Sequence, residues 1–87
     1  MGLKATVYTG PGWSWCDRVK VLLQDNEYEI EEKAINSPFG ASFLEEFQNK
    51  FNETMRTIPQ VVIDDKLIGG YAEVEDLIKG LTSINKV

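Results

Sequence analysis

The fold is decided by residues 8–20, which read YTGPGWSWCDRVK. An apolar run leads into the Gly/Pro-rich turn at 10–12, and apolar residues then recur at i, i+3, i+6 and i+7 from Cys16. We therefore predict a strand over 4–8, a tight loop, and a helix over 14–25 with the cysteine in its first turn. The unpaired N–H groups of a helix N-terminus favour a thiolate, so this cysteine is a candidate for chemistry as well as for packing.

The middle of the chain continues the alternation of strands and helices. Residues 28–34 alternate in part between apolar and charged residues, which is typical of an edge strand because exposed charge discourages stray pairing. Ser37 is the expected N-cap of the next helix and Pro38 its first residue. Phenylalanines at helical spacing extend this predicted helix over 38–51.

The last third of the chain predicts a hairpin and a helix. Strands over 60–63 and 66–68 flank the two-residue turn Asp64-Asp65, and glycines end the second strand. A final helix with period 3.6 includes Val74 and ends near 80–83. The order βαβαββα predicts an α/β fold in which a four-stranded mixed sheet is flanked by three helices, with helices on both faces.

Composition limits the classes of function. The 87 residues suit one domain, 1–87, and no apolar run approaches the roughly 20 residues of a membrane helix. A net charge of −5 argues against nucleic acid and anionic membrane surfaces as partners. Without histidine and with one cysteine, the chain can form neither a structural zinc site nor an intrachain disulfide, so no metal is expected. A lone free cysteine favours a reducing, cytoplasmic compartment.

This arrangement resembles the glutaredoxins, a family with the thioredoxin-like fold. Their signature is a strand ending in Tyr-Thr or Tyr-Ser, a Pro-containing turn, and Cys-x-x-Cys opening a helix. Over this chain, Cys16 falls on the second cysteine and Trp13 on the first, which is the family's nucleophile. The resemblance covers nearly the whole chain. It implies glutathione-coupled thiol–disulfide oxidoreduction, with glutathione as co-substrate, disulfide-containing proteins as substrates, and a monomer.

The replacement of the family's first cysteine by Trp13 limits the reactions that this chain can catalyse. Neither a dithiol cycle nor the monothiol route of the family is available without the first cysteine, so we expect very low turnover. Cys16 has an even chance of being a small buried hydrophobe. An alternative hypothesis for the whole chain is a non-catalytic module that binds glutathione or a peptide. A third hypothesis is a scaffold that binds no ligand.

The resemblance also implies which residues bind glutathione. Thr57, Ile58 and Pro59 match the family's Thr-Val-Pro, whose proline is cis, although from sequence alone a trans proline at a strand start is the commoner case. In the family the backbone of this loop grips the cysteine of glutathione. Relatives carry a lysine before the first turn that binds the glycine carboxylate. Gly10 stands there in this chain, so Arg56 becomes the best candidate.

The start of the last helix is the third expected contact. The simplest interpretation is that a turn is formed by Gly70, Tyr71 and Ala72. The functional interpretation is that these residues present the N–H groups of a helix N-terminus to the γ-glutamyl carboxylate. The family usually has Asp near this place, and Glu73 is the possible substitute. Trp15 is expected to border the same site and to shield the cysteine.

Overall fold

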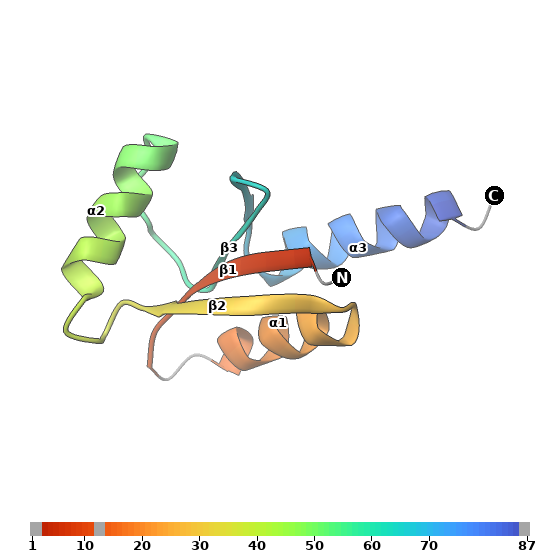
Figure 1. Ribbon diagram of the computed structural model, residues 1–87, viewed down its shortest axis with the longest axis horizontal. Helices are drawn as coiled ribbons and strands as arrows, with labels where there is room; N and C mark the ends of the chain where they lie inside the picture. Colours follow the sequence, from red (N-terminus) through yellow and green to blue (C-terminus); the bar gives the residue numbers. More distant parts are fainter. Residues whose placement is uncertain (1–2, 12–13, 86–87) are drawn as a thin grey trace.

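The computed structural model describes residues 3–11 and 14–85, and of residues 81–85 it describes the backbone alone. The elements are β1 (Leu3–Thr9), α1 (Ser14–Asp25), β2 (Tyr28–Ala34), α2 (Gly40–Phe51), β3 (Gln60–Ile63), β4 (Lys66–Gly69) and α3 (Tyr71–Asn85). The predicted order βαβαββα is confirmed (Figure 1). No helix in the described part of the chain is long and apolar enough to cross a membrane.

The four strands form one mixed sheet in the order β2-β1-β3-β4. β1 and β2 run parallel, joined by α1, whereas β3 is antiparallel to both β1 and β4. The charged strand β2 lies at one edge, as its sequence predicts. Asp64 and Asp65 both have positive φ in the hairpin turn, a conformation that short polar residues tolerate better than most.

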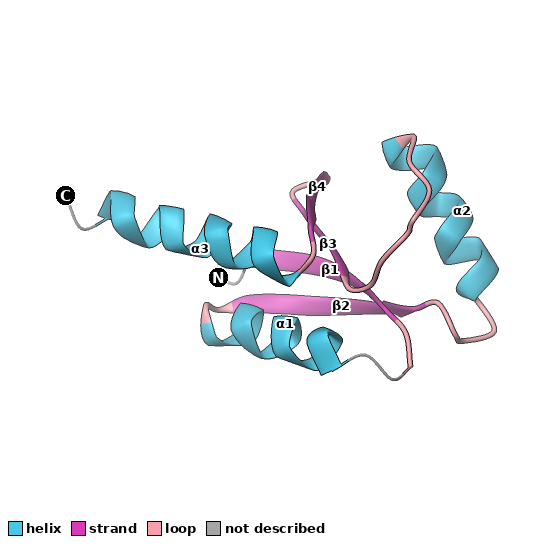
Figure 2. Ribbon diagram, turned by 180° about the vertical axis from the view of Figure 1, so that it is seen from behind, coloured by secondary structure: helices cyan, strands magenta, loops and turns pink. Residues whose placement is uncertain are grey.

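Helices cover both faces of the sheet, as predicted (Figure 2). On one face α1 and α3 bury Val19, Leu23 and Val74 against Val7 and Val61 of the two central strands. On the other face α2 packs through one buried phenylalanine. The members of that smaller core are Tyr8, Phe47 and Val62, with Phe43, Phe51, Met55 and Leu67 packed around them.

The start of α2 differs from the prediction. The N-cap is Phe39 and no side chain caps the helix, so Ser37 is not the N-cap and Pro38 is not helical. Instead, the Ser37 hydroxyl donates to the Ala34 carbonyl at 2.7 Å and accepts the Phe39 N–H at 3.2 Å, which holds a turn ahead of the helix. The helix begins at Gly40 because the chain there passes close to the preceding loop.

Candidate functional site

Strand register brings three loops to one end of the sheet. Tyr8, near the end of β1, pairs with Gln60 at the start of β3. Val61 pairs with Gly69 at the end of β4. The loop after β1 therefore meets the loop before β3 and the start of α3, although about fifty residues of sequence separate it from the other two.

A groove of about 480 Å³ lies where these loops meet. It is lined by Trp15, Thr57, Ile58, Pro59, Gly70, Tyr71, Ala72, Glu73 and Glu75. Seven of these nine were expected as glutathione-binding residues from the sequence. Trp13, the position of the family's nucleophile, lies outside the described residues.

One wall of the groove is aromatic. The ring centroids of Trp15 and Tyr71 are 5.4 Å apart, with the planes tilted at 53°. The guanidinium of Arg18 lies 4.7 Å from the centroid of the Trp15 ring, which adds a cation–π contact on α1. Trp15 is nevertheless 46% exposed and is one of the residues that line the groove. This wall offers a ligand two tilted aromatic rings, one held on α1 and the other on α3.

The opposite wall is the loop that precedes β3. The Ile58-Pro59 peptide bond is cis, as the resemblance implied. The Gln60 side-chain amide donates to the Thr57 carbonyl at 3.0 Å and to its hydroxyl at 2.9 Å, which holds this loop against the start of the strand. A Cβ at Gly70 would lie 3.5 Å from the Pro59 carbonyl oxygen, so the loop and the start of α3 are in contact.

The N-terminus of α3 forms the floor between these walls. Glu73 Oε1 accepts the Gly70 N–H at 2.8 Å, which is the reach-back half of a capping box. The N–H groups of Tyr71 and Ala72 donate to no acceptor within residues 3–11 and 14–85. Two unpaired donors at a helix N-terminus suit an anionic group, provided that the neighbouring carboxylates leave it room.

Cys16 does not line this groove. Its side chain is only 4% exposed and lies in the first turn of α1, as predicted. It borders a separate polar hollow of about 460 Å³. The other lining residues are Thr9, Gly10, Ser14, Asp17, Lys20 and Glu32. Burial favours packing as the main role of this cysteine in the chain as it stands.

The hollow beside Cys16 contains a bonded charge network. The buried Thr9 hydroxyl donates to Glu32 Oε2 at 2.7 Å, and Lys20 Nζ lies 3.1 Å from Glu32 Oε1. The hydrogen bond from Thr9 and the contact with Lys20 hold the pKa of the Glu32 carboxyl below its usual value. The hydrogen bond to Glu32 in turn raises the pKa of Lys20. The charges of Lys20 and Glu32 pair with each other, and neither residue lines the groove.

Arg56 is the expected binding residue that the groove does not include. It lines two other hollows, next to α2. Lys50, near the end of α2, pairs with Asp65 at 2.7 Å. Sequence reasoning missed Glu75, which lines the groove one turn into α3. Its position two residues after Glu73 was the available signal. Among the described residues, no three His, Cys, Asp or Glu side chains are placed to hold a metal ion.

Comparisons with known proteins agree with this geometry. The family model described as Glutaredoxin matches residues 5–68. The structure is similar to glutaredoxin 1 from Francisella tularensis, with 27% identity over 94% of this chain and 99% of that one, and a TM-score of 0.73. It shares its fold with Escherichia coli glutaredoxin, at 22% identity over 90% of this chain and 95% of that one, with a TM-score of 0.73.

A complex of buckwheat glutaredoxin with glutathione also shares the fold, at 22% identity over 87% of this chain and 68% of that one, with a TM-score of 0.71. No curated protein sequence matches the chain.

Proposed function

Since this chain belongs to the glutaredoxin family of thiol–disulfide oxidoreductases, we propose that its groove binds glutathione while its own turnover is strongly impaired. The observation that carries the proposal is the convergence of the Trp15–Tyr71 wall, the Thr57–Pro59 loop and the start of α3 on one groove. Each wall supplies a different kind of contact to a tripeptide thiol.

The contacts follow from the chemistry of the walls. Ile58 lines the groove, and we expect its backbone to pair with the extended backbone of the glutathione cysteine. The N–H groups of Tyr71 and Ala72 suit the γ-glutamyl carboxylate. The carboxylates of Glu73 and Glu75 stand at the same end, where the γ-glutamyl ammonium would lie. No cation lines the groove among the described residues, so we expect the glycine carboxylate to add little affinity.

The impaired turnover follows from the position of Cys16 and from the absence of a cysteine at position 13. In the family reaction a thiolate attacks a glutathione mixed disulfide, a new S–S bond forms to the enzyme, and the substrate thiol leaves. A second glutathione thiolate then attacks that bond and releases oxidised glutathione. Trp13 stands where the attacking sulfur would be, and Cys16 is buried outside the groove. The chain as written therefore supports binding far better than exchange.

A titration with reduced glutathione tests the binding half of the proposal. Saturable amide shifts are expected at Ile58, Gly70 and Tyr71, together with a change in tryptophan fluorescence because Trp15 borders the groove. Residues at the opposite end of the β3–β4 hairpin, such as Lys66, serve as the internal control and should not shift. No change at millimolar glutathione would contradict the proposal.

The Trp13→Cys variant tests the catalytic half. We expect it to reduce a glutathionylated peptide with glutathione as the second thiol, and we expect the unchanged chain and Cys16→Ser to remain near background. Activity in the variant would identify the unchanged chain as an oxidoreductase that lacks only its nucleophilic cysteine. A folded, glutathione-binding but inactive variant instead favours the second candidate function, a non-catalytic binding module. The burial of Cys16 beside an intact groove is the observation that favours that candidate.

A further inference from the structure

A further hollow runs along α1, outside the groove. Its volume is about 370 Å³. Its lining residues are Asp17, Arg18, Val21, Leu22, Asp25 and Tyr71. All of them except Tyr71 belong to α1, and Tyr71 also lines the groove. The hollow therefore adjoins the groove at the start of α3 and includes no residue of the loop before β3.

Val21 gives this hollow an exposed apolar centre. The side of α1 that faces the sheet buries Val19 and Leu23, and Val21 lies two residues from each, so it points away from the sheet. Its side chain is 54% exposed, and the half-buried Leu22 and Tyr71 line the hollow with it. The solvent-facing side of a helix is normally polar, so these three residues mark a surface for contact with another molecule.

The charges around Val21 are acidic. Asp17 and Asp25 lie one helical turn before and after it, and residues four apart share one face of a helix. Asp25 has no hydrogen bond or ion pair with another described residue. Asp17 has only Lys20, at 3.7 Å, and its side chain is 83% exposed. The guanidinium of Arg18 is engaged with the Trp15 ring at 4.7 Å. The strip therefore favours cationic groups that flank an apolar side chain.

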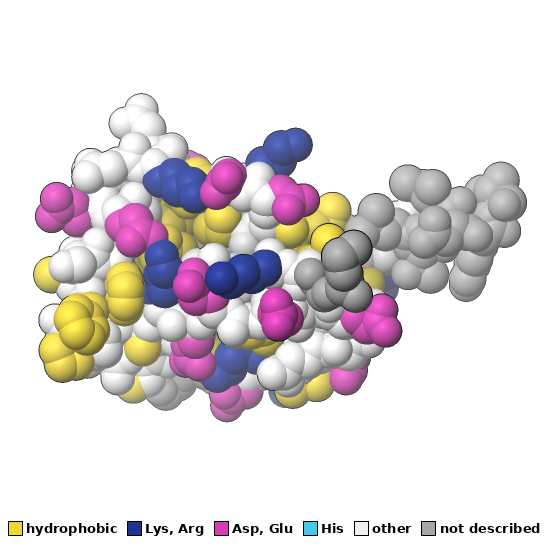
Figure 3. Space-filling view, viewed as in Figure 1, with side chains coloured by type: hydrophobic (Ala, Val, Ile, Leu, Met, Phe, Trp, Pro, Cys, Tyr) yellow, Lys and Arg dark blue, Asp and Glu magenta, His cyan; other side chains and the backbone are white. Residues whose placement is uncertain are grey.

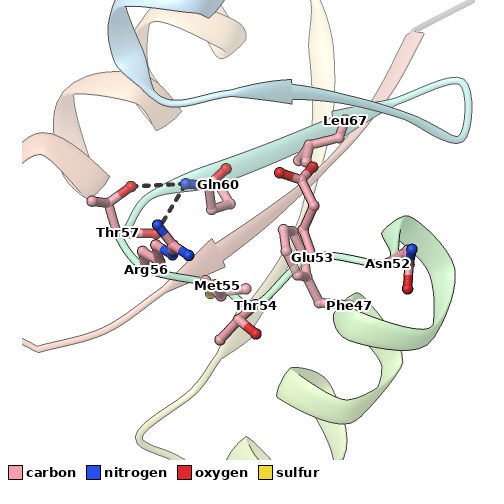
Figure 4. Close-up of a pocket in the computed structure, with 9 residues that line it drawn as sticks. All are labelled: Phe47, Asn52, Glu53, Thr54, Met55, Arg56, Thr57, Gln60 and Leu67. Carbon is pink, nitrogen blue, oxygen red and sulfur yellow. Dashed lines mark hydrogen bonds between the residues drawn. The ribbon is translucent and has the colours of Figure 1, made fainter.

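The α2 side of the molecule lacks this combination. Figure 3 shows basic and acidic side chains interleaved across the face formed by β2 and α2, with apolar side chains gathered near the start of α2. Lys33 pairs there with Glu46, and Lys50 pairs with Asp65. The pocket beside α2 in Figure 4 is lined mainly by polar and charged side chains. Because the charges on these surfaces largely neutralise one another, α2 supplies exposed positions for control variants.

We propose that the strip formed by Asp17, Val21, Asp25 and Tyr71 docks a basic amphipathic helix of a partner protein. A large aliphatic residue of that helix packs on Val21 in the hollow, and lysines one turn before and after it pair with the two aspartates. Asp17 and Asp25 are separated by about 12 Å of helix axis, so a helix lying along α1 needs the spacing Lys-x-x-x-Leu-x-x-x-Lys. The net charge of −5 attracts such a partner from a distance. This interaction surface goes beyond the proposed glutathione site.

The probes are capped, alanine-based helical peptides of about twenty residues. The first carries Lys-x-x-x-Leu-x-x-x-Lys, the second has glutamates and the third glutamines in place of the lysines, and the fourth has the first composition with the lysines moved to the opposite face. In NMR titrations we expect the first peptide to bind about tenfold more tightly than the glutamate peptide and about fivefold more tightly than the permuted one. Amide shifts are expected at Val21, Leu22 and Tyr71, and not at Leu44.

Two pairs of variants isolate the contacts. Val21→Lys should weaken binding of the lysine peptide about tenfold, because the apolar contact is lost and a like charge is added. Leu44→Lys adds the same charge at a 40% exposed position of α2 and should have little effect. Asp25→Asn should weaken the lysine peptide about threefold and leave the glutamine peptide unchanged. Glu45→Gln removes one exposed carboxylate from α2 and is its control.

The docking surface is refuted if the lysine and glutamate peptides bind equally, if the permuted peptide binds as tightly as the first, or if Val21→Lys weakens binding no more than Leu44→Lys. It is also refuted if sedimentation shows that the chain alone self-associates with the same shifts at Val21 and Tyr71, because the occupant is then a second copy. Glutathione titrations give a separate result. Val21→Lys and Asp25→Asn should bind glutathione as the unchanged chain does, since neither residue lines the groove.

Discussion

The contact between the first loop and Ile58 makes a quantitative prediction. A Cβ added at Gly10 would lie 2.4 Å from Ile58 Cδ1, while its next neighbours, on Ile35, would be at ordinary distances of 3.5 and 3.8 Å. Cδ1 is the atom that isoleucine has and valine lacks. Gly10→Ala should therefore force Ile58 from its rotamer at a cost of about 0.5–1.5 kcal/mol.

Two further contributions complete the estimate of the change in the free energy of unfolding. Alanine reduces the conformational freedom of the unfolded chain, which offsets about 0.4–1 kcal/mol of the cost at a position with ordinary φ. Ile58→Val alone should cost about 0.5 kcal/mol, the low end of its range, because the side chain is half-buried. In the double variant the clash is absent, so Gly10→Ala should become neutral or stabilising.

The assay is a double-mutant cycle by urea denaturation, followed by far-UV circular dichroism. We expect a coupling free energy of about 0.5–1.5 kcal/mol between the two positions. Leu44→Ala combined with Gly10→Ala is a useful reference, because a Cβ at Gly10 would not reach Leu44. Additive effects of Gly10→Ala and Ile58→Val, within about 0.3 kcal/mol, would refute the steric argument.

Three other changes test the supports of the groove and the fold. Glu73→Gln should lower the free energy of unfolding by about 0.5–1 kcal/mol by weakening the cap of α3. Asp76→Asn removes a carboxylate from an exposed position of the same helix and should cost under about 0.3 kcal/mol; equal losses in urea denaturation would contradict the capping role. Gly40→Ala should cost about 2–4 kcal/mol in the same assay, because its Cβ would lie 1.7 Å from the Ile35 carbonyl oxygen and the backbone must move; a neutral effect would show that the loop yields easily. Burial, and then the nearby Glu46 carboxylate, raises the pKa of Tyr8 to about 12, so its contribution to stability is complete below pH 10 and is lost as the pH rises towards 12. Tyr8→Phe should therefore lose less stability than the unchanged chain over that interval, and parallel pH profiles would contradict the assignment.

Most of the fold followed from local patterns in the sequence. Helical spacing from Cys16 and the alternation in β2 each gave an element with the observed bounds, because both patterns are set by burial on one face. The start of α2 did not follow. Ser37 and Pro38 carry a strong local signal for a helix start, but Ser37 serves the turn, and Gly40 begins the helix where the chain passes the Ile35 carbonyl. That approach is a tertiary contact, which no local signal contains.

The groove was predictable from the sequence at its backbone turns and less so at its side chains. The loop at Pro59 and the glycine turn before α3 are recognisable because few residues permit those conformations. The direction of Arg56 was not recognisable, because a long side chain next to a loop reaches either side of it, and the structure shows it beside α2. The cap from Glu73 has only half of the usual sequence signal, because the first capping position is Gly70 rather than Ser, Thr, Asp or Asn.

In the proposed function, binding and turnover depend on different segments of the chain. The family's attacking cysteine corresponds to position 13, between β1 and α1 in the sequence, whereas the groove is built mainly from the loop before β3 and the start of α3. Replacing a residue on the first segment leaves the backbone donors of the other two in place. What it removes is the covalent bond that holds a glutathione or a substrate after the first attack. Affinity must then come from non-covalent contacts alone, and the groove itself offers two carboxylates and no cation within the described residues.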